Sequence, residues 1–112
     1  MMKIAEEQAG DVTIIAVNGQ VDSNTAKSFE EKLIGLFASG RNRVIVDFKN
    51  LAYITSAGFR VLLVAAKLAE KSDGRLALCG MTAEVSRVFD LGHMTDLFAI
   101  YPSREEGLAK LS

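Results

Sequence analysis

The spacing of apolar and polar positions in the first third of the chain predicts two strands followed by a helix. Residues 3–8 and 12–17 flank the turn residues at positions 9–11 and are predicted to form strands, the second ending at Gly19. After the polar pair Ser23-Asn24, apolar residues recur at helical spacing until Ser39-Gly40, with charged residues between them. The apolar stripe of this helix consists of Ala26, Phe29, Leu33 and Leu36 or Phe37.

The stretch from residue 44 to residue 63 predicts a strand, a turn and a second helix. Val44–Phe48 is an apolar, β-branched run that stops at Lys49-Asn50, which is typical of a strand covered on both faces. From Phe59 the period changes to that of a helix, so residues 54–58 should lie at a helix start. The apolar stripe of this helix is predicted to be Phe59, Leu62, Leu63 and Ala66.

The last third of the chain continues the alternation of strands and helices. A strand is predicted at residues 75–79, a helix from Thr82 to Gly92, a short strand at residues 98–101 and a last helix opened by Ser103 and Glu106 as a capping box. Strands that alternate with helices favour βαβ units and a mostly parallel sheet, to which the first two strands can add as a hairpin. The sequence therefore predicts a single α/β domain over residues 1–112.

Two of the predicted helix starts should lie at the same end of this sheet, because each follows a strand that runs into a helix. One start lies near residues 22–24 and the other at residues 55–58. We expect this edge to be the surface that contacts a partner.

Ser56 at the second of these helix starts has two interpretations that rest on the same physics. Ser56, or Thr55 before it, can be an N-cap whose hydroxyl accepts a hydrogen bond from an N–H two or three residues on. Alternatively, the free N–H groups and the positive end of the helix dipole suit a phosphate on the serine. Local sequence alone favours the cap, and it leaves the phosphate open.

The helix after Ser56 carries more apolar residues than one stripe requires. Val61, Val64 and Ala65 add apolar side chains on other sides of the helix. Either the helix is buried on two faces, or an exposed valine pair next to Ser56 forms a docking patch.

Composition and charge narrow the classes of function. The chain has 112 residues, of which 49% are hydrophobic and 24% charged, which fits one ordinary soluble domain. A net charge of −1 gives no broad basic field for nucleic acid or anionic lipid. The N-terminus lacks the apolar core of a secretory signal, the longest apolar run (residues 61–66) is too short to cross a bilayer, and Cys79 is the single cysteine. We therefore expect a cytoplasmic protein without direct membrane insertion.

Residues for catalysis or metal binding are scarce. The chain has no phosphate-binding P-loop, and Cys79 and His93 are each the only residue of their type. Cys79 is expected to be a small buried residue, and His93 a helix C-cap or surface residue. Asp22 and Asp47 are better explained as cap and strand-end residues than as an acid/base pair. We expect no enzyme, no metal site and no cofactor.

The segment NLAYITSAGFRVLL resembles the signature of the STAS domain, and specifically of bacterial anti-sigma factor antagonists. The resemblance spans nearly the whole chain and implies a mixed, mostly parallel sheet with about four helices. It places the phosphorylated serine of the family at Ser56 and the glycine of its motif at Gly58. Thr55 stands where the family often has aspartate, so it is a second candidate acceptor. Arg60 matches the variant of the motif that carries arginine.

The resemblance also implies partners and a mechanism. The unphosphorylated protein would bind an anti-sigma factor serine kinase, phosphorylation of Ser56 would release it, a phosphoserine phosphatase would reset the switch, and sigma-factor-dependent transcription would follow. Partner contacts are expected at Asp22, Asn24, Thr55, Ser56, Ala57, Gly58, Arg60, Val61 and Val64. The alternatives are a constitutive scaffold or transporter-associated subunit, in which Ser56 is only a cap, and a phosphocarrier. The sequence leaves a weak homodimer open.

Overall fold

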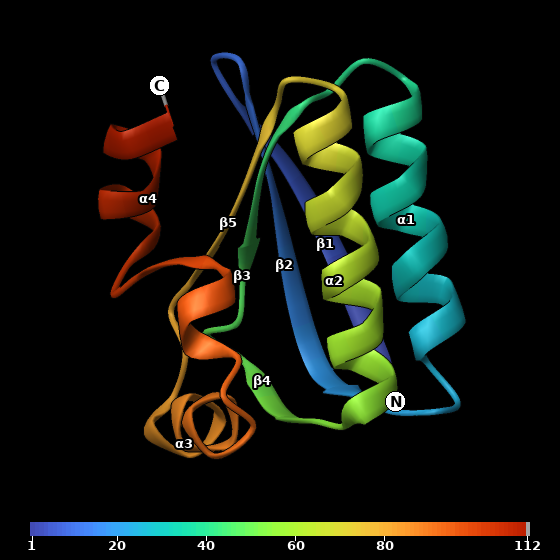
Figure 1. Cartoon of the computed structure of the whole chain (residues 1–112), viewed down its shortest axis with the longest axis vertical. Helices are drawn as coiled ribbons and strands as arrows, with labels where there is room; N and C mark the ends of the chain where they lie inside the picture. Colours follow the sequence, from blue (N-terminus) through green and yellow to red (C-terminus); the bar gives the residue numbers. More distant parts are fainter. Residues whose placement is uncertain (112) are drawn as a thin grey trace.

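A mixed sheet forms the centre of the structure, a computed structural model that describes residues 1–111 (Figure 1). In this part of the chain the sheet has six strands and is accompanied by four α-helices and one 3-10 helix. In chain order the elements are β1 (Met2–Ala9), β2 (Val12–Val21), α1 (Ala26–Ala38), β3 (Arg43–Asp47), β4 (Leu51–Ile54), α2 (Ser56–Lys71), β5 (Arg75–Cys79), α3 (Ala83–Leu91), η1 (Thr95–Leu97), β6 (Ala99–Tyr101) and α4 (Arg104–Leu111). The predicted α/β fold class is confirmed.

The strands follow the order β1-β2-β3-β5-β6, with β4 paired to β2 outside this path. β1 is antiparallel to β2, as a hairpin predicts, and the remaining pairs are parallel. The prediction that Gly19 ends the second strand is wrong, since β2 continues to Val21. At Gly19 the backbone has φ +104° and pairing with β4 begins, with a register shift between Gly19 and Gln20.

The sheet carries its helices unequally on its two faces. Figure 1 shows α1 and α2 side by side on one side of the sheet and α4 on the other. The larger core lies under α1 and α2, and its fully buried side chains include Phe29, Leu33, Val46, Phe48, Leu62 and Phe89. The smaller core under α4 consists of Val12, Ile14, Ile45, Ala77, Cys79 and Leu111.

The fold explains the positions of Cys79 and His93, each the only residue of its type in the sequence. Cys79 is buried as expected, and this burial, followed by the charge of Asp47, raises the pKa of its thiol to about 12. Because the thiolate is the nucleophile, Cys79 is chemically inert near neutral pH. His93 is exposed and follows the helix-ending Gly92 with a left-handed φ of 57°.

The buried face of α2 differs from the predicted stripe. Leu62 is buried as expected, but Leu63 is 37% exposed, whereas Val61 is 1% exposed. The residues that pack inward are Gly58, Val61, Leu62, Ala65 and Ala69. The glycine and alanines among them leave room for the sheet and α1 to approach closely, and this selects a face that apolarity alone does not identify.

Candidate phosphorylation and partner-binding site

The two polar helix starts meet at one end of the sheet, as predicted. The parallel ladder between β2 and β4 places Val21 beside Ile54, and the Thr55 N–H donates to the Val21 carbonyl oxygen at 2.9 Å. The Tyr53 hydroxyl lies 3.4 Å from Asp22 Oδ2. The start of α1 and the start of α2 therefore form one continuous surface.

Thr55 occupies the N-cap position of α2, but its side chain does not cap the helix. Its backbone is extended, and its carbonyl oxygen accepts from the N–H groups of Gly58 and Phe59 at 2.9 and 3.1 Å. Its hydroxyl donates toward the Val21 carbonyl oxygen at 3.4 Å, and the residue is only partly exposed. The Thr55 hydroxyl is thus directed back to β2.

Ser56 is the first residue of α2 and is exposed. Within residues 1–111 its hydroxyl has no hydrogen-bond partner, so the prediction that Ser56 or Thr55 caps this helix through its side chain is wrong. Of the first N–H groups of α2, that of Gly58 donates to the Thr55 carbonyl oxygen, and the first turn contains no acidic side chain that would compete for the others. The arrangement presents a free hydroxyl next to the positive end of a helix dipole.

Asp22, expected to be a cap residue, fixes the turn that leads into α1, whose N-cap is Thr25 without a side-chain cap hydrogen bond. Its Oδ1 accepts from the N–H groups of Asn24 and Thr25 at 2.9 and 3.2 Å, while the Asp22 N–H donates to the Thr25 hydroxyl at 3.0 Å. The Asn24 N–H, followed by the Gln20 side chain, holds the pKa of the Asp22 carboxyl below its ordinary value. A charged carboxylate is therefore fixed at the predicted partner surface.

The other predicted contact residues fall into two groups. Asn24 and Arg60 are exposed, and Ala57 and Val64 are partly exposed; Arg60 lies 3.9 Å from Glu30 Oε1 of α1. Gly58 and Val61 are buried, so of the two interpretations of the additional apolar residues the exposed valine pair is wrong, because Val61 packs into the core. The exposed apolar side chain of this part of α2 is Leu63.

Sequence reasoning missed three polar residues of this surface. Gln20 Nε2 donates to Asp22 Oδ2 at 3.2 Å, Tyr53 contacts the same oxygen, and Thr25 donates to the Gln20 carbonyl oxygen at 3.0 Å. The Tyr53 contact depends on β4, which was predicted as a turn. Its four residues follow a buried-exposed-exposed-buried order and not a strict alternation, so the sequence carried no clear strand signal there.

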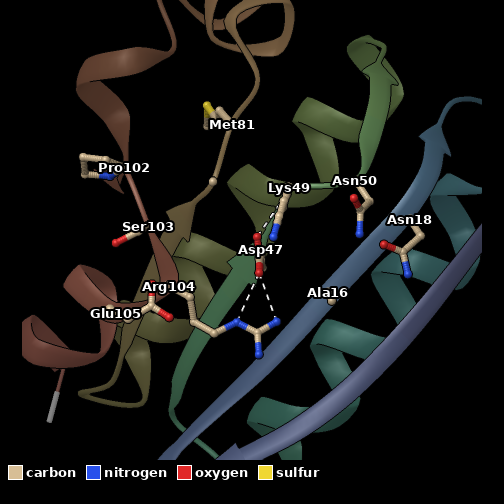
Figure 2. Close-up of a pocket in the computed structure, with 11 residues that line it drawn as sticks. Ala16, Asn18, Asp47, Lys49, Asn50, Met81, Pro102, Ser103, Arg104 and Glu105 are labelled. Carbon is tan, nitrogen blue, oxygen red and sulfur yellow. Dashed lines mark hydrogen bonds and ion pairs between the residues drawn. The ribbon is translucent and has the colours of Figure 1, made fainter.

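A separate polar cavity of about 630 Å³ lies on the α4 side of the sheet (Figure 2). Arg104 reaches across it to Asp47, with its Nε and one terminal nitrogen 3.2 and 3.0 Å from Asp47 Oδ2, and another terminal nitrogen is 3.0 Å from Glu7. Asp47 Oδ1 accepts from the Lys49 N–H at 3.0 Å. Both oxygens of Asp47 are therefore engaged: Oδ2 holds α4 against the sheet, and Oδ1 fixes the turn after β3.

Residues 1–111 offer neither a metal site nor a membrane-spanning helix. This part of the chain contains no cluster of three or more His, Cys, Asp or Glu residues arranged for a metal ion. None of its helices has both the length and the apolarity needed to span a bilayer.

The chain is similar to known proteins over nearly its whole length. The family model of the STAS domain matches residues 3–107. The chain belongs to the STAS domain family. This STAS domain is 33% identical over 108 residues to BtrV of Bordetella bronchiseptica, a protein named as an anti-sigma factor antagonist, and the match covers 96% of this chain and 93% of BtrV. Such relatives carry the names of regulatory binding proteins, not of enzymes.

Solved structures share the fold of this STAS domain. A Thermotoga maritima protein named as an anti-sigma factor antagonist superposes with a TM-score of 0.91 at 21% identity, covering 96% of this chain and 93% of that chain. The Bacillus cell fate determinant SpoIIAA in its phosphorylated form superposes with a TM-score of 0.75 at 18% identity, covering 98% and 100%. The predicted STAS-like fold is confirmed.

Proposed function

We propose that this STAS domain is an anti-sigma factor antagonist whose binding to an anti-sigma factor kinase is switched off by phosphorylation of Ser56. The observation that carries the proposal is the contrast between two neighbouring hydroxyls. Ser56 is exposed and without a hydrogen-bond partner within residues 1–111, whereas the Thr55 hydroxyl is directed to the Val21 carbonyl oxygen. A kinase can reach the Ser56 hydroxyl without displacing an existing contact.

The domain is expected to tolerate the phosphate without unfolding. A phosphoserine carries about −1.5 to −2 charges near neutral pH. At a helix N-terminus such charge is typically stabilised by about 0.3 to 2 kcal/mol. The first turn of α2 adds no acidic side chain to oppose it, and Arg60 lies one turn further along the helix. Phosphorylation is therefore expected to change the affinity for the partner and not the stability of the fold.

At that interface the added charge is unfavourable. The surface already holds the Asp22 carboxylate, so a partner that fits the unmodified surface is matched to one negative group and not to two. Like-charge or poorly matched contacts cost several kcal/mol in an interface, and each 1.4 kcal/mol is about tenfold in affinity. Phosphorylation then releases the kinase, which is free to hold a sigma factor again.

The names of two similar proteins support the proposed function. BtrV is named as an anti-sigma factor antagonist, and SpoIIAA, which has this fold, has been solved in a phosphorylated form. In the proposed cycle the unphosphorylated domain sequesters the kinase and frees the sigma factor for transcription. A phosphoserine phosphatase restores the binding form.

Site mapping with the anti-sigma kinases of the source organism and ATP tests the acceptor. Wild type and the Thr55→Ala variant should each gain one phosphate, and the Ser56→Ala variant should gain none. Phosphate that is lost only in Thr55→Ala would move the switch to Thr55. No phosphate on any of the three proteins would favour a constitutive scaffold.

A further inference from the structure

The outer edge of β1 is long and carries no further strand within residues 1–111. In this part of the chain β1 lies at the margin of the sheet and pairs along eight consecutive residues with β2 alone. Every second residue of such a strand directs its N–H and C=O groups away from the sheet. The opposite margin, β6, is only three residues long, which is a common way of limiting edge pairing. β1 has no proline and no register shift that would block a further strand.

The charges on β1 are arranged so that the strand is complementary to itself. Lys3, Ala5 and Glu7 lie on one face of the sheet, since successive residues of a strand alternate between faces. In an antiparallel pair of two β1 strands with Ala5 opposite Ala5, each Lys3 stands opposite Glu7 of the other copy. Opposite charges in directly opposed positions stabilise a strand pair.

Neighbouring registers lack this match. Two residues that stand opposite each other must lie on the same face of the joint sheet. The centre of the strand pairing can therefore move only from one residue to the next, for example from Ala5 to Ile4 or Glu6. Centring on Ile4 sets Lys3 opposite Ala5, and centring on Glu6 sets the two Glu6 side chains opposite each other. The register centred on Ala5 is therefore selected by charge.

The side chains of β1 leave this contact available. Glu7 contacts Arg104 through Oε1 only, and its side chain is 65% exposed. Glu6, on the other face, is neutralised within its own chain by Lys32 and Arg41, and its contact with Lys32 holds its pKa below the ordinary value. A second copy therefore meets no unpaired acid on that face.

We propose that the β1 edge is a self-association surface, on which a second copy of this chain adds antiparallel with Ala5 opposite Ala5. The two sheets become continuous, and α1 and α2 of both copies lie on the same side of the joint sheet. The association is weak, because one strand contact buries less area than the interface of a stable dimer. It involves none of the groups proposed for the phosphorylation switch.

Sedimentation equilibrium of variants with reversed charges on β1 tests the proposal. Wild type should show a monomer–dimer equilibrium at protein concentrations up to about 1 mM, in keeping with a small interface. In a dimer of either Lys3→Glu or Glu7→Lys, like charges stand opposite each other at both of the positions where wild type pairs Lys3 with Glu7. Each variant should therefore associate at least about tenfold more weakly than wild type. An equimolar mixture of the two variants restores opposite charges in both pairs and should associate as strongly as wild type.

The control is Asp11→Lys, which changes charge in the turn after β1 and should leave association unchanged. Thermal unfolding of each variant establishes that it is folded, which matters for Glu7→Lys because of Arg104. A wild type that stays monomeric at the highest concentration overturns the proposal. A mixture that associates no better than its two components also overturns it.

Discussion

At the scale of single residues, the orientation of a hydroxyl distinguishes two adjacent candidates. Thr55 and Ser56 differ by one position, yet one side chain is turned to the Val21 carbonyl oxygen and the other is exposed. A threonine at the N-cap whose hydroxyl contacts β2 cannot satisfy the first N–H groups of α2. The helix start thus keeps donors available next to Ser56, which is the condition for stabilising a phosphate there.

Asp22 gives a prediction for the pH dependence of stability. Hydrogen bonds from Asn24 and Gln20 lower its folded pKa, so the carboxylate contributes stability above its unfolded pKa of about 3.9. That contribution is lost as the pH falls through the lower folded value. Wild type should be more stable than Asp22→Asn at neutral pH, and the difference should shrink in urea titrations below about pH 4. A difference that stays constant down to pH 2 would contradict the assignment.

At the scale of elements, close packing of α2 on the sheet fixes where Ser56 lies. A Cβ on Gly58 would stand 2.5 Å from Ile54 Cγ1 and 2.8 Å from Val21 Cγ1. Both contacts belong to the strands that position the site, β2 and β4. Gly58 is therefore a packing residue that sets the distance between the helix start and the strand ends.

Gly58→Ala should destabilise the domain by about 1 to 3 kcal/mol, because the added methyl group overpacks the contact between α2 and the sheet. The matched control is Gly35→Ala in α1, where a Cβ meets nothing within 4 Å. In a helix interior this change should stabilise by about 0.5 to 1 kcal/mol. Chemical denaturation of the two variants measures the contrast, and equal effects would be inconsistent with close packing at Gly58.

Helices and most strands were predictable from sequence because their signals are local. The stripe from Ala26 to Phe37, the helix that starts at Thr82 and the strand Arg75–Cys79 appear as predicted. β4 was missed because four residues give little periodicity and its partner is the continuation of β2 beyond Gly19. The inward face of α2 depends on contacts with distant strands, so local apolarity did not identify Val61 as a buried residue.

At the scale of the whole molecule, α4 closes the second face of the sheet. Leu111 packs into the smaller core, and Arg104 joins α4 to Asp47 of β3 and Glu7 of β1. One side chain thereby links the C-terminal helix to the central and marginal strands. The face opposite Ser56 depends on this short helix for its cover.

Arg104→Ala should lower the free energy of unfolding by about 1 to 3 kcal/mol, because the buried Asp47 loses its charged partner. Hydrogen exchange of α4 should accelerate more than that of α1 or α2. The control is Arg87→Ala on α3, an exposed arginine without an ion pair in residues 1–111, which should change stability by less than about 0.5 kcal/mol. Equal losses in both variants would refute the role of Arg104.

The most direct test of the switch is a calorimetric titration of the cognate anti-sigma factor kinase with this domain in two forms, unmodified and phosphorylated on Ser56. The phosphorylated form should bind at least about tenfold more weakly at equal fold stability. Ala109→Asp, which adds negative charge to exposed α4 on the opposite side of the sheet, should bind like wild type. Equal affinity of the phosphorylated and unmodified forms would contradict the account.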